Sequence, residues 1–138
     1  MTPRHRVASC GAEEARLRME QAEAYLVAAG LATGEAGGAW GTVAAGNAVL
    51  AGIAASDAIC CVRLGERARG EDHHEAVALL ARATPDGSQL AQTLERLLSI
   101  KDQSHYGVDL VSSSRARSAL RQATRLLPRA KQELERGR

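Results

Sequence analysis

Aromatic residues are scarce in this sequence: its 138 residues include one Trp, two Tyr and no Phe. Because β-branched residues are also scattered, the chain has too few strand-favouring side chains to build a sheet. Hydrophobic residues still make up 45% of the chain, and most of them are Ala and Leu, which favour helices. We therefore predict one all-α domain over residues 1–138, an antiparallel up-and-down bundle of about five helices, with residues 1–10 flexible.

Cysteine is also rare, with residues only at positions 10, 60 and 61. Cys60 and Cys61 are adjacent in a helical run, where a mutual bridge would strain the backbone. Three cysteines in such a pattern provide no disulfide framework. We predict reduced thiols and a cytoplasmic location.

Long apolar runs are missing as well. Asp57 and Arg63 interrupt the one candidate for the roughly 20 apolar residues that a membrane span needs. The basic residues at the start of the chain are not followed by the unbroken apolar core of a signal peptide. The sequence therefore predicts no membrane association.

Apolar periodicity and capping residues divide the chain into helices. We expect them at about 11–30, 39–67, 72–83, 88–106 and 113–134. The second of these is the most apolar and should be central, with Trp40 and Val43 on its wide buried face. Its glycines at positions 41, 46 and 52 lower the helix propensity, so we expect neighbouring helices to approach closely there.

No strong catalytic motif occurs, and the best candidate site lies near the end of the fourth helix. Lys101 and His105 are four residues apart, so their side chains would share a helix face. A cation beside an imidazole can hold a phosphate and transfer a proton, as cleavage of RNA by its own 2′-hydroxyl requires. Tyr106 could stack on a base. The alternative is a polar helix end in which positive charge suits the helix dipole.

Asp57 lies in an apolar part of the second helix and therefore needs a partner, since an unpaired buried charge is costly. It could face a cleft beside Lys101 or His105, or it could pair with a structural arginine. His73 and His74 are adjacent, so their imidazoles diverge by about 100° on a helix and cannot easily bind one metal ion. We predict no metal and no cofactor.

Basic charge is concentrated at the C-terminal end, where residues 113–138 include 8 basic and 2 acidic residues. Arginines recur every four residues on the final helix, with Arg115 nearby, at Arg117, Arg121, Arg125 and Arg129. Such a ridge could neutralise several phosphates of a nucleic acid. A solvated face, or an interface with an acidic protein, would show the same pattern.

Three segments together resemble the HEPN superfamily of small helical bundles: Ser56–His73, Ala76–Leu80 and Ile100–Gly107. The resemblance covers residues 40 to 135, and it implies an antiparallel bundle that is generally dimeric. Active members are metal-independent ribonucleases, often in toxin–antitoxin or phage-defence systems. Their motif is an arginine followed, after four to six residues, by a histidine.

This chain departs from that motif, because Lys101 replaces the arginine and only three residues separate it from His105. Lysine lacks the planar, bidentate grip of a guanidinium on phosphate. The resemblance therefore favours a non-catalytic homodimeric domain that binds RNA, a nucleotide or a protein partner such as an antitoxin or a nucleotidyltransferase. The alternative is a metal-independent ribonuclease that uses Lys101 and His105, oriented by Asp57 and Tyr106.

Overall fold

The computed structural model describes residues 7–35, 38–69, 73–105 and 110–137, with the backbone alone for residues 101–105. Within these ranges the chain forms five helices and two short strands. They follow one another as β1 (Val7–Ser9), α1 (Ala12–Thr33), α2 (Trp40–Leu64), β2 (Glu66–Ala68), α3 (His73–Ala83), α4 (Gly87–His105) and α5 (Ser113–Arg136). The prediction of an all-α bundle is confirmed.

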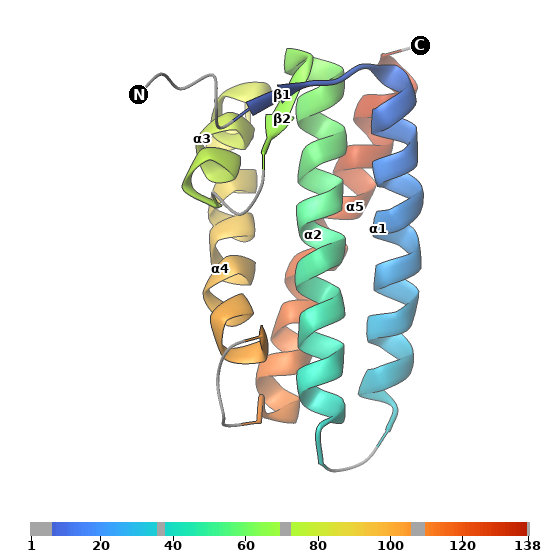
Figure 1. The fold of residues 1–138 in the computed structure, drawn as a ribbon, viewed down its shortest axis with the longest axis vertical. Coiled ribbons are helices and arrows are strands. Elements are labelled where there is room, and N and C mark those ends of the chain that lie inside the picture. The colour runs from blue at the N-terminus through green and yellow to red at the C-terminus, as the bar shows by residue number, and fades with distance from the viewer. Residues whose placement is uncertain (1–6, 36–37, 70–72, 106–109, 138) are drawn as a thin grey trace.

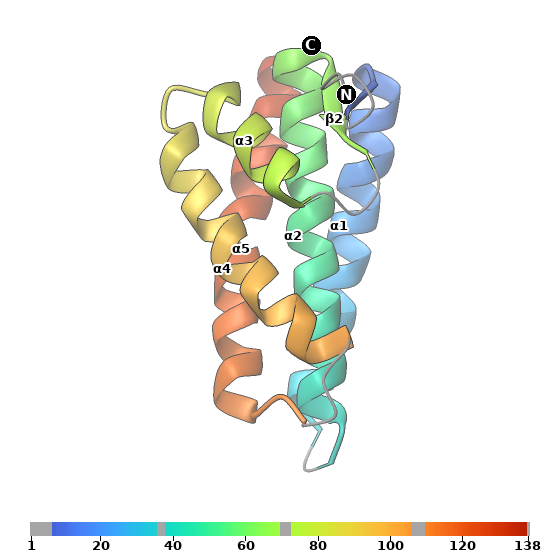
Figure 2. The same ribbon diagram turned by 60° about the vertical axis from the view of Figure 1, so that its left-hand side comes forward.

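The four long helices run up and down, and the short α3 lies across the end of the bundle where the two strands are (Figure 1). Seen from the side, α3 and α4 cover one flank of α2, with α5 behind them (Figure 2). Helix α2 packs against all four other helices. The sequence-based expectation that the second helix is central is therefore confirmed.

Alanine makes up more than half of the buried apolar residues that the structure describes. Larger side chains fill the spaces between the alanines, and the bulkiest fully buried ones are Ile59, Leu79, Leu80, Leu94, Leu97 and Leu126. Because alanine adds little volume, the helix axes can approach closely, and the few leucines suffice to fill the core.

Two glycines of α2 mark these close approaches. A Cβ atom at Gly52 would lie 2.4 Å from Cδ1 of Leu97, and one at Gly41 would lie 2.3 Å from the carbonyl oxygen of Val111. The Val111 N–H also donates a hydrogen bond to Oγ1 of Thr42 at 2.9 Å. The predicted close approach of a neighbouring helix is confirmed at Gly52, whereas at Gly41 the close neighbour is the segment before α5, which is held against the start of α2.

The expectation that the chain lacks any sheet is wrong in one detail. β1 and β2 pair antiparallel, with Val7 opposite Ala68 and Ser9 opposite Glu66. Strand propensity plays little part here, because Gly65 ends α2 in the left-handed conformation at φ 70° and turns the chain into an extended segment. Residues 7–10, expected to be flexible, are thus held to the bundle.

Cys10 and Cys61 form a disulfide, with 5.2 Å between their Cα atoms. The prediction of reduced thiols is therefore wrong for both residues and holds only for Cys60, which is free and buried. The pairing arises because β1 returns to the end of α2, where the Cys10 N–H donates to the Gly65 carbonyl. Closing a loop of this length stabilises a fold by about 4 kcal/mol. Disulfides persist mainly in oxidising compartments, so the predicted cytoplasmic location loses one of its supports.

By length and composition α2 could cross a membrane, although the sequence analysis found no such segment. The candidate window lies in Trp40–Leu64, and 72% of it is buried inside the bundle. The core helix of a water-soluble bundle has these same properties, because its other helices take the place of lipid.

The predicted burial of the second helix is wrong at the start of α2. Trp40 and Val43 were expected on the buried face, but 45% and 41% of their surfaces are exposed. They lie next to the turn that joins α1 to α2.

A pair of glycine substitutions tests the close packing of α2. Replacing Gly41 by Ala should lower the free energy of unfolding by about 1–3 kcal/mol, because the new methyl group meets the Val111 backbone. Replacing Gly30 by Ala should raise it by up to about 1 kcal/mol, since nothing lies within 4 Å and alanine is the better helix former. Urea denaturation followed by circular dichroism measures both, and equal effects would contradict the packing described.

Candidate functional site

The predicted pair at the end of the fourth helix lies in regular helix. α4 continues to His105, so positions 101 and 105 are one helical turn apart, as their spacing predicts. The side chains of Lys101 and His105 and the whole of Tyr106 lie outside the described part of the chain.

Asp57 is paired with an arginine, which was one of the two alternatives. Its Oδ2 accepts hydrogen bonds from Arg18 of α1, at 3.0 Å from Nε and 2.9 Å from Nη2. Burial raises the pKa of Asp57 above its ordinary value, although the Arg18 charge and hydrogen bond act in the opposite direction. Asp57 therefore joins α1 to α2 as a structural ion pair.

The bundle separates Asp57 from the end of α4. Leu97 packs at the level of Gly52, and from there α2 rises five residues to Asp57 while α4 descends eight residues to His105. At 1.5 Å per residue, the two backbones are displaced along the bundle by roughly 20 Å. In one chain the backbone of His105 therefore lies far from Asp57 along the bundle.

The four arginines of α5 do not form one straight ridge. Four residues turn a helix by about 400°, so each arginine is rotated by about 40° from the one before. Arg117 consequently lies beside α1, in a hollow that Thr33 and Glu35 also line. Arg121 and Arg125 are exposed, whereas Arg129 turns toward the α3–α4 connection.

Arg129 belongs to a structural network and not to a free basic surface. Its Nη2 and Nε donate to the two carboxylate oxygens of Asp86 at 2.8 and 3.3 Å. Its Nη1 donates to Glu133 at 3.2 Å. The assignment of Arg129 to a nucleic-acid-binding ridge is thus not supported, because acidic partners occupy its guanidinium.

Glu133 is the centre of this network, with a side chain that is only 1% exposed. Its Oε1 accepts from Nη1 of Arg63 at 3.1 Å, and Arg136 also approaches it at 3.6 Å. Arg63 in turn donates to the carbonyl of Ala83, the last residue of α3. One carboxylate therefore holds α2, α5 and the end of α3 together.

The Asp86–Arg129 pair also sets a pH dependence. Hydrogen bonds from Arg129 and Thr84 hold the pKa of Asp86 below its ordinary value of 3.8. The pair therefore contributes its stability above that pH and loses it as the pH falls through the lowered pKa. Since the Asp86 side chain is 42% exposed, solvent screening keeps this contribution below about 1 kcal/mol.

The Cys60 thiol is a poor candidate for a catalytic nucleophile. Burial, with the nearby charge of Asp57, raises the pKa of Cys60 to about 12, so this thiol stays protonated at neutral pH. Within the described ranges, no three His, Cys, Asp or Glu residues gather closely enough to hold a metal ion.

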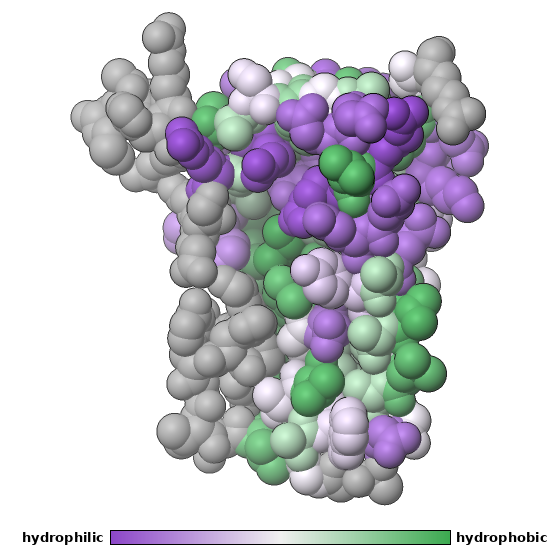
Figure 3. Space-filling view, turned by 45° about the vertical axis from the view of Figure 1, so that its right-hand side comes forward, coloured by the Kyte–Doolittle hydropathy of each residue, from purple (hydrophilic) through white to green (hydrophobic). Residues whose placement is uncertain are grey.

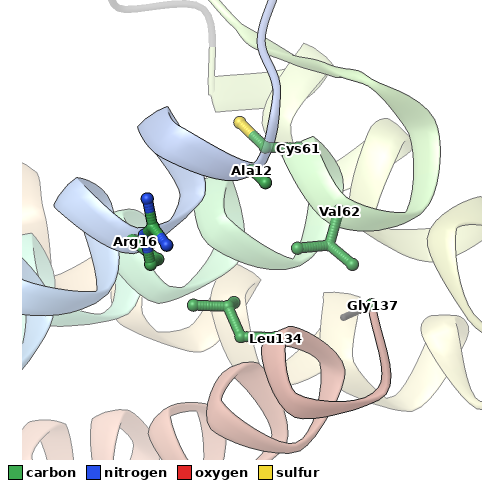
Figure 4. Close-up of a pocket in the computed structure, with 6 residues that line it drawn as sticks. All are labelled: Ala12, Arg16, Cys61, Val62, Leu134 and Gly137. Carbon is green, nitrogen blue, oxygen red and sulfur yellow. The ribbon is translucent and has the colours of Figure 1, made fainter.

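A pocket of about 180 Å³ lies where the start of α1 meets the ends of α2 and α5 (Figure 4). Val62 and Leu134 form its apolar floor, and Arg16 lines one side while it pairs with Glu13. Cys61 also lines it, but its sulfur is bonded to Cys10. The lining residues therefore include neither a nucleophile nor an acid–base pair.

The most distinctive surface is apolar, and sequence reasoning missed it. Figure 3 shows that the half of this face near the α1–α2 turn is mostly hydrophobic, whereas the other half is hydrophilic. Val27 and Leu31 of α1 are 64% and 72% exposed, and Trp40 and Val43 follow at the start of α2. We call these four residues the hairpin patch.

Charge is almost absent around the hairpin patch. Between Ala24 and Ser56 the only charged residue is Glu35. The lack of charged residues in this segment is visible in the sequence. The apolar face of the second helix was nevertheless predicted to be buried along its whole length, because helical periodicity does not show where a neighbouring helix stops covering it.

The sequence matches no protein-family model and no curated protein sequence.

The Glu133 network makes a sharp prediction about stability. Replacing Glu133 by Gln should lower the free energy of unfolding by about 1.5–3 kcal/mol, because Arg63 would lose its charged partner, whereas Arg129 would keep Asp86. Glu135→Gln on the exposed side of the same helix should change it by less than about 0.5 kcal/mol. Thermal or urea unfolding compares them, and a loss below about 1 kcal/mol for Glu133→Gln would contradict the central role of this carboxylate.

Proposed function

We propose that this chain is a non-catalytic, HEPN-like helical domain that works by docking a protein on the hairpin patch, and that the protein is a second copy of itself. The observation that carries the proposal is the exposure of Val27, Leu31, Trp40 and Val43 in a helix–turn–helix segment, Ala24 to Ser56, whose only charged residue is Glu35. Exposed apolar surface of this kind marks an interaction site.

The chemistry of the patch favours a second copy. A two-fold dimer brings the same patch from both chains together, so each surface must be complementary to itself. Apolar surfaces meet this condition, because two identical uncharged surfaces do not repel each other. With Glu35 as the only charged residue in the hairpin segment, self-association carries almost no like-charge repulsion.

Trp40 suits a protein interface in particular, since tryptophan is among the residues that contribute most to binding energy. A lipid surface fits less well. Membrane-binding apolar faces are usually flanked by several lysines and arginines, whereas the segment that forms this patch has none, and its one charged residue, Glu35, shares a hollow with Arg117 of α5.

Self-association is directly measurable. The wild-type protein should sediment near twice the chain mass of 14.6 kDa at micromolar concentration. The double substitution Val27→Glu and Leu31→Glu should weaken dimerisation at least about tenfold, because each copy would present charge to the other. Both side chains are exposed, so the fold should persist.

The matched control is Leu17→Glu. Leu17 is 51% exposed on the same helix, but its neighbours are Arg16 and Arg18 in the hydrophilic half. This variant should remain dimeric. A wild-type protein that stays monomeric at high concentration, or a control that dissociates like the double variant, would refute the proposal.

Two findings support the proposal that the domain is non-catalytic. Asp57 is bound to Arg18 and is displaced from the end of α4, and position 101 is lysine where the ribonuclease motif has arginine. These findings support the proposal, because the Asp57 carboxylate already has a structural partner and Lys101 would hold a phosphate without the planar, bidentate grip of an arginine.

An RNA-cleavage assay tests this part. We expect no cleavage of single-stranded RNA by the wild-type protein or by His105→Ala, in buffer that contains a chelator. Cleavage by the wild type that disappears in His105→Ala would establish a metal-independent ribonuclease with His105 as its general acid or base, and would overturn the non-catalytic reading.

A further inference from the structure

A shallow groove runs between α4 and α5 on a different face from the hairpin patch. Its volume is about 190 Å³. α4 contributes Arg96, Ser99 and Ile100, and α5 contributes Arg115, Ser118 and Gln122. Two arginines from separate helices therefore line the same space, and none of these six residues is acidic.

Neither arginine has an acidic partner within the part of the chain that the structure describes. This distinguishes them from Arg18, Arg63 and Arg129, which the bundle uses in ion pairs. Two like charges that line one groove repel each other, and the repulsion is relieved when an anion lies between them. Arg96 and Arg115 therefore fit a binding role better than a structural one.

The remaining polar groups add hydrogen-bond donors. Gln122 accepts a bond from Nη1 of Arg125 with its amide oxygen at 3.4 Å, which leaves its NH₂ group to donate. Ser118 also lines the groove, and on the α4 side the donor is Arg96, since the Ser99 hydroxyl already donates to the Arg96 carbonyl at 2.7 Å. Donors thus come from both walls, while Ile100 is the one apolar lining residue.

This arrangement suits a tetrahedral oxyanion. A carboxylate is planar and is satisfied by one bidentate arginine, whereas a phosphate has oxygens in several directions and can accept from two walls at once. The groove also lies beside the first turns of α5, where the positive end of the helix dipole adds to the attraction.

We propose that the α4–α5 groove binds a phosphate group, with Arg96 and Arg115 as its two principal ligands and Ser118 and Gln122 as additional donors. The phosphate could be a free phosphomonoester or one link of an RNA strand, since both present the same oxygens. The site is independent of the hairpin patch and of self-association.

Binding is tested with three probes: inorganic phosphate, uridine 5′-monophosphate and a short oligouridine. Amide chemical shifts of the isotope-labelled full chain should move at Ser99, Ser118 and Gln122 when a probe binds. A response to the monophosphate identifies a phosphomonoester site, and a response to the oligouridine alone identifies a strand site. No shift with any of the three would overturn the proposal.

Two matched variants separate a specific site from general basic charge. Arg96→Gln with Arg115→Gln should weaken probe binding at least about tenfold, because it removes both charged ligands. Arg117→Gln with Arg121→Gln removes the same charge outside the groove and should weaken it less than about threefold. All four side chains are exposed, and circular dichroism melting confirms that both variants fold. Equal weakening by the two variants would overturn the proposal in favour of diffuse attraction.

Discussion

The close approach of neighbouring elements to α2 is the constraint on which the rest of this structure depends. Gly52 leaves room for Leu97, and Gly41 leaves room for the Val111 carbonyl. With alanine along most of its buried length, α2 brings the other four helices close to one axis. Bulky side chains at these positions would push α4 and the start of α5 outward, and the core leucines would no longer meet.

The close packing of small residues is not the only feature that holds the bundle together, because charged pairs are distributed unevenly along it. The end near the strands contains the Asp57–Arg18 pair, the Glu133 network and the Cys10–Cys61 disulfide. At the end near the α1–α2 turn, these two helices have almost no charge, since Glu35 is the only charged residue from Ala24 to Ser56. Directional and covalent links therefore secure the first end. At the second, contacts between apolar side chains and the hydrogen bond from Val111 to Thr42 hold α2, and the apolar surface continues into solvent.

The two proposed surfaces have different physical characters. The hairpin patch would gain its affinity from apolar area removed from water, which depends little on salt. The α4–α5 groove would gain its affinity from two guanidinium groups and should weaken as ionic strength rises. One small bundle could thus join two chains at one face while it holds a phosphate at another, with neither function requiring a reactive group.

The sequence by itself determined the class of fold and most of the helices. Alanine and leucine at helical spacing specify five helices, and the second one, which is the most apolar, was expected to be the centre. Its end was less accurately predicted, because Gly65 stops the helix before the predicted boundary. The helical spacing of positions 101 and 105 was also predictable, since it is a local property.

Only the tertiary structure decided which partners the polar residues have. Asp57 needed a counter-charge, but the choice of Arg18 depends on how α1 lies against α2. In the sequence, Arg129 does not differ from the other arginines of its series. Only the tertiary structure places Asp86 and Glu133 within hydrogen-bond distance of it. Cys10 and Cys61 are separated by 51 positions in sequence and meet only because β1 folds back on β2. Helical periodicity reports which face of one helix is apolar, whereas the partner of a charge or a thiol depends on segments far away in the chain.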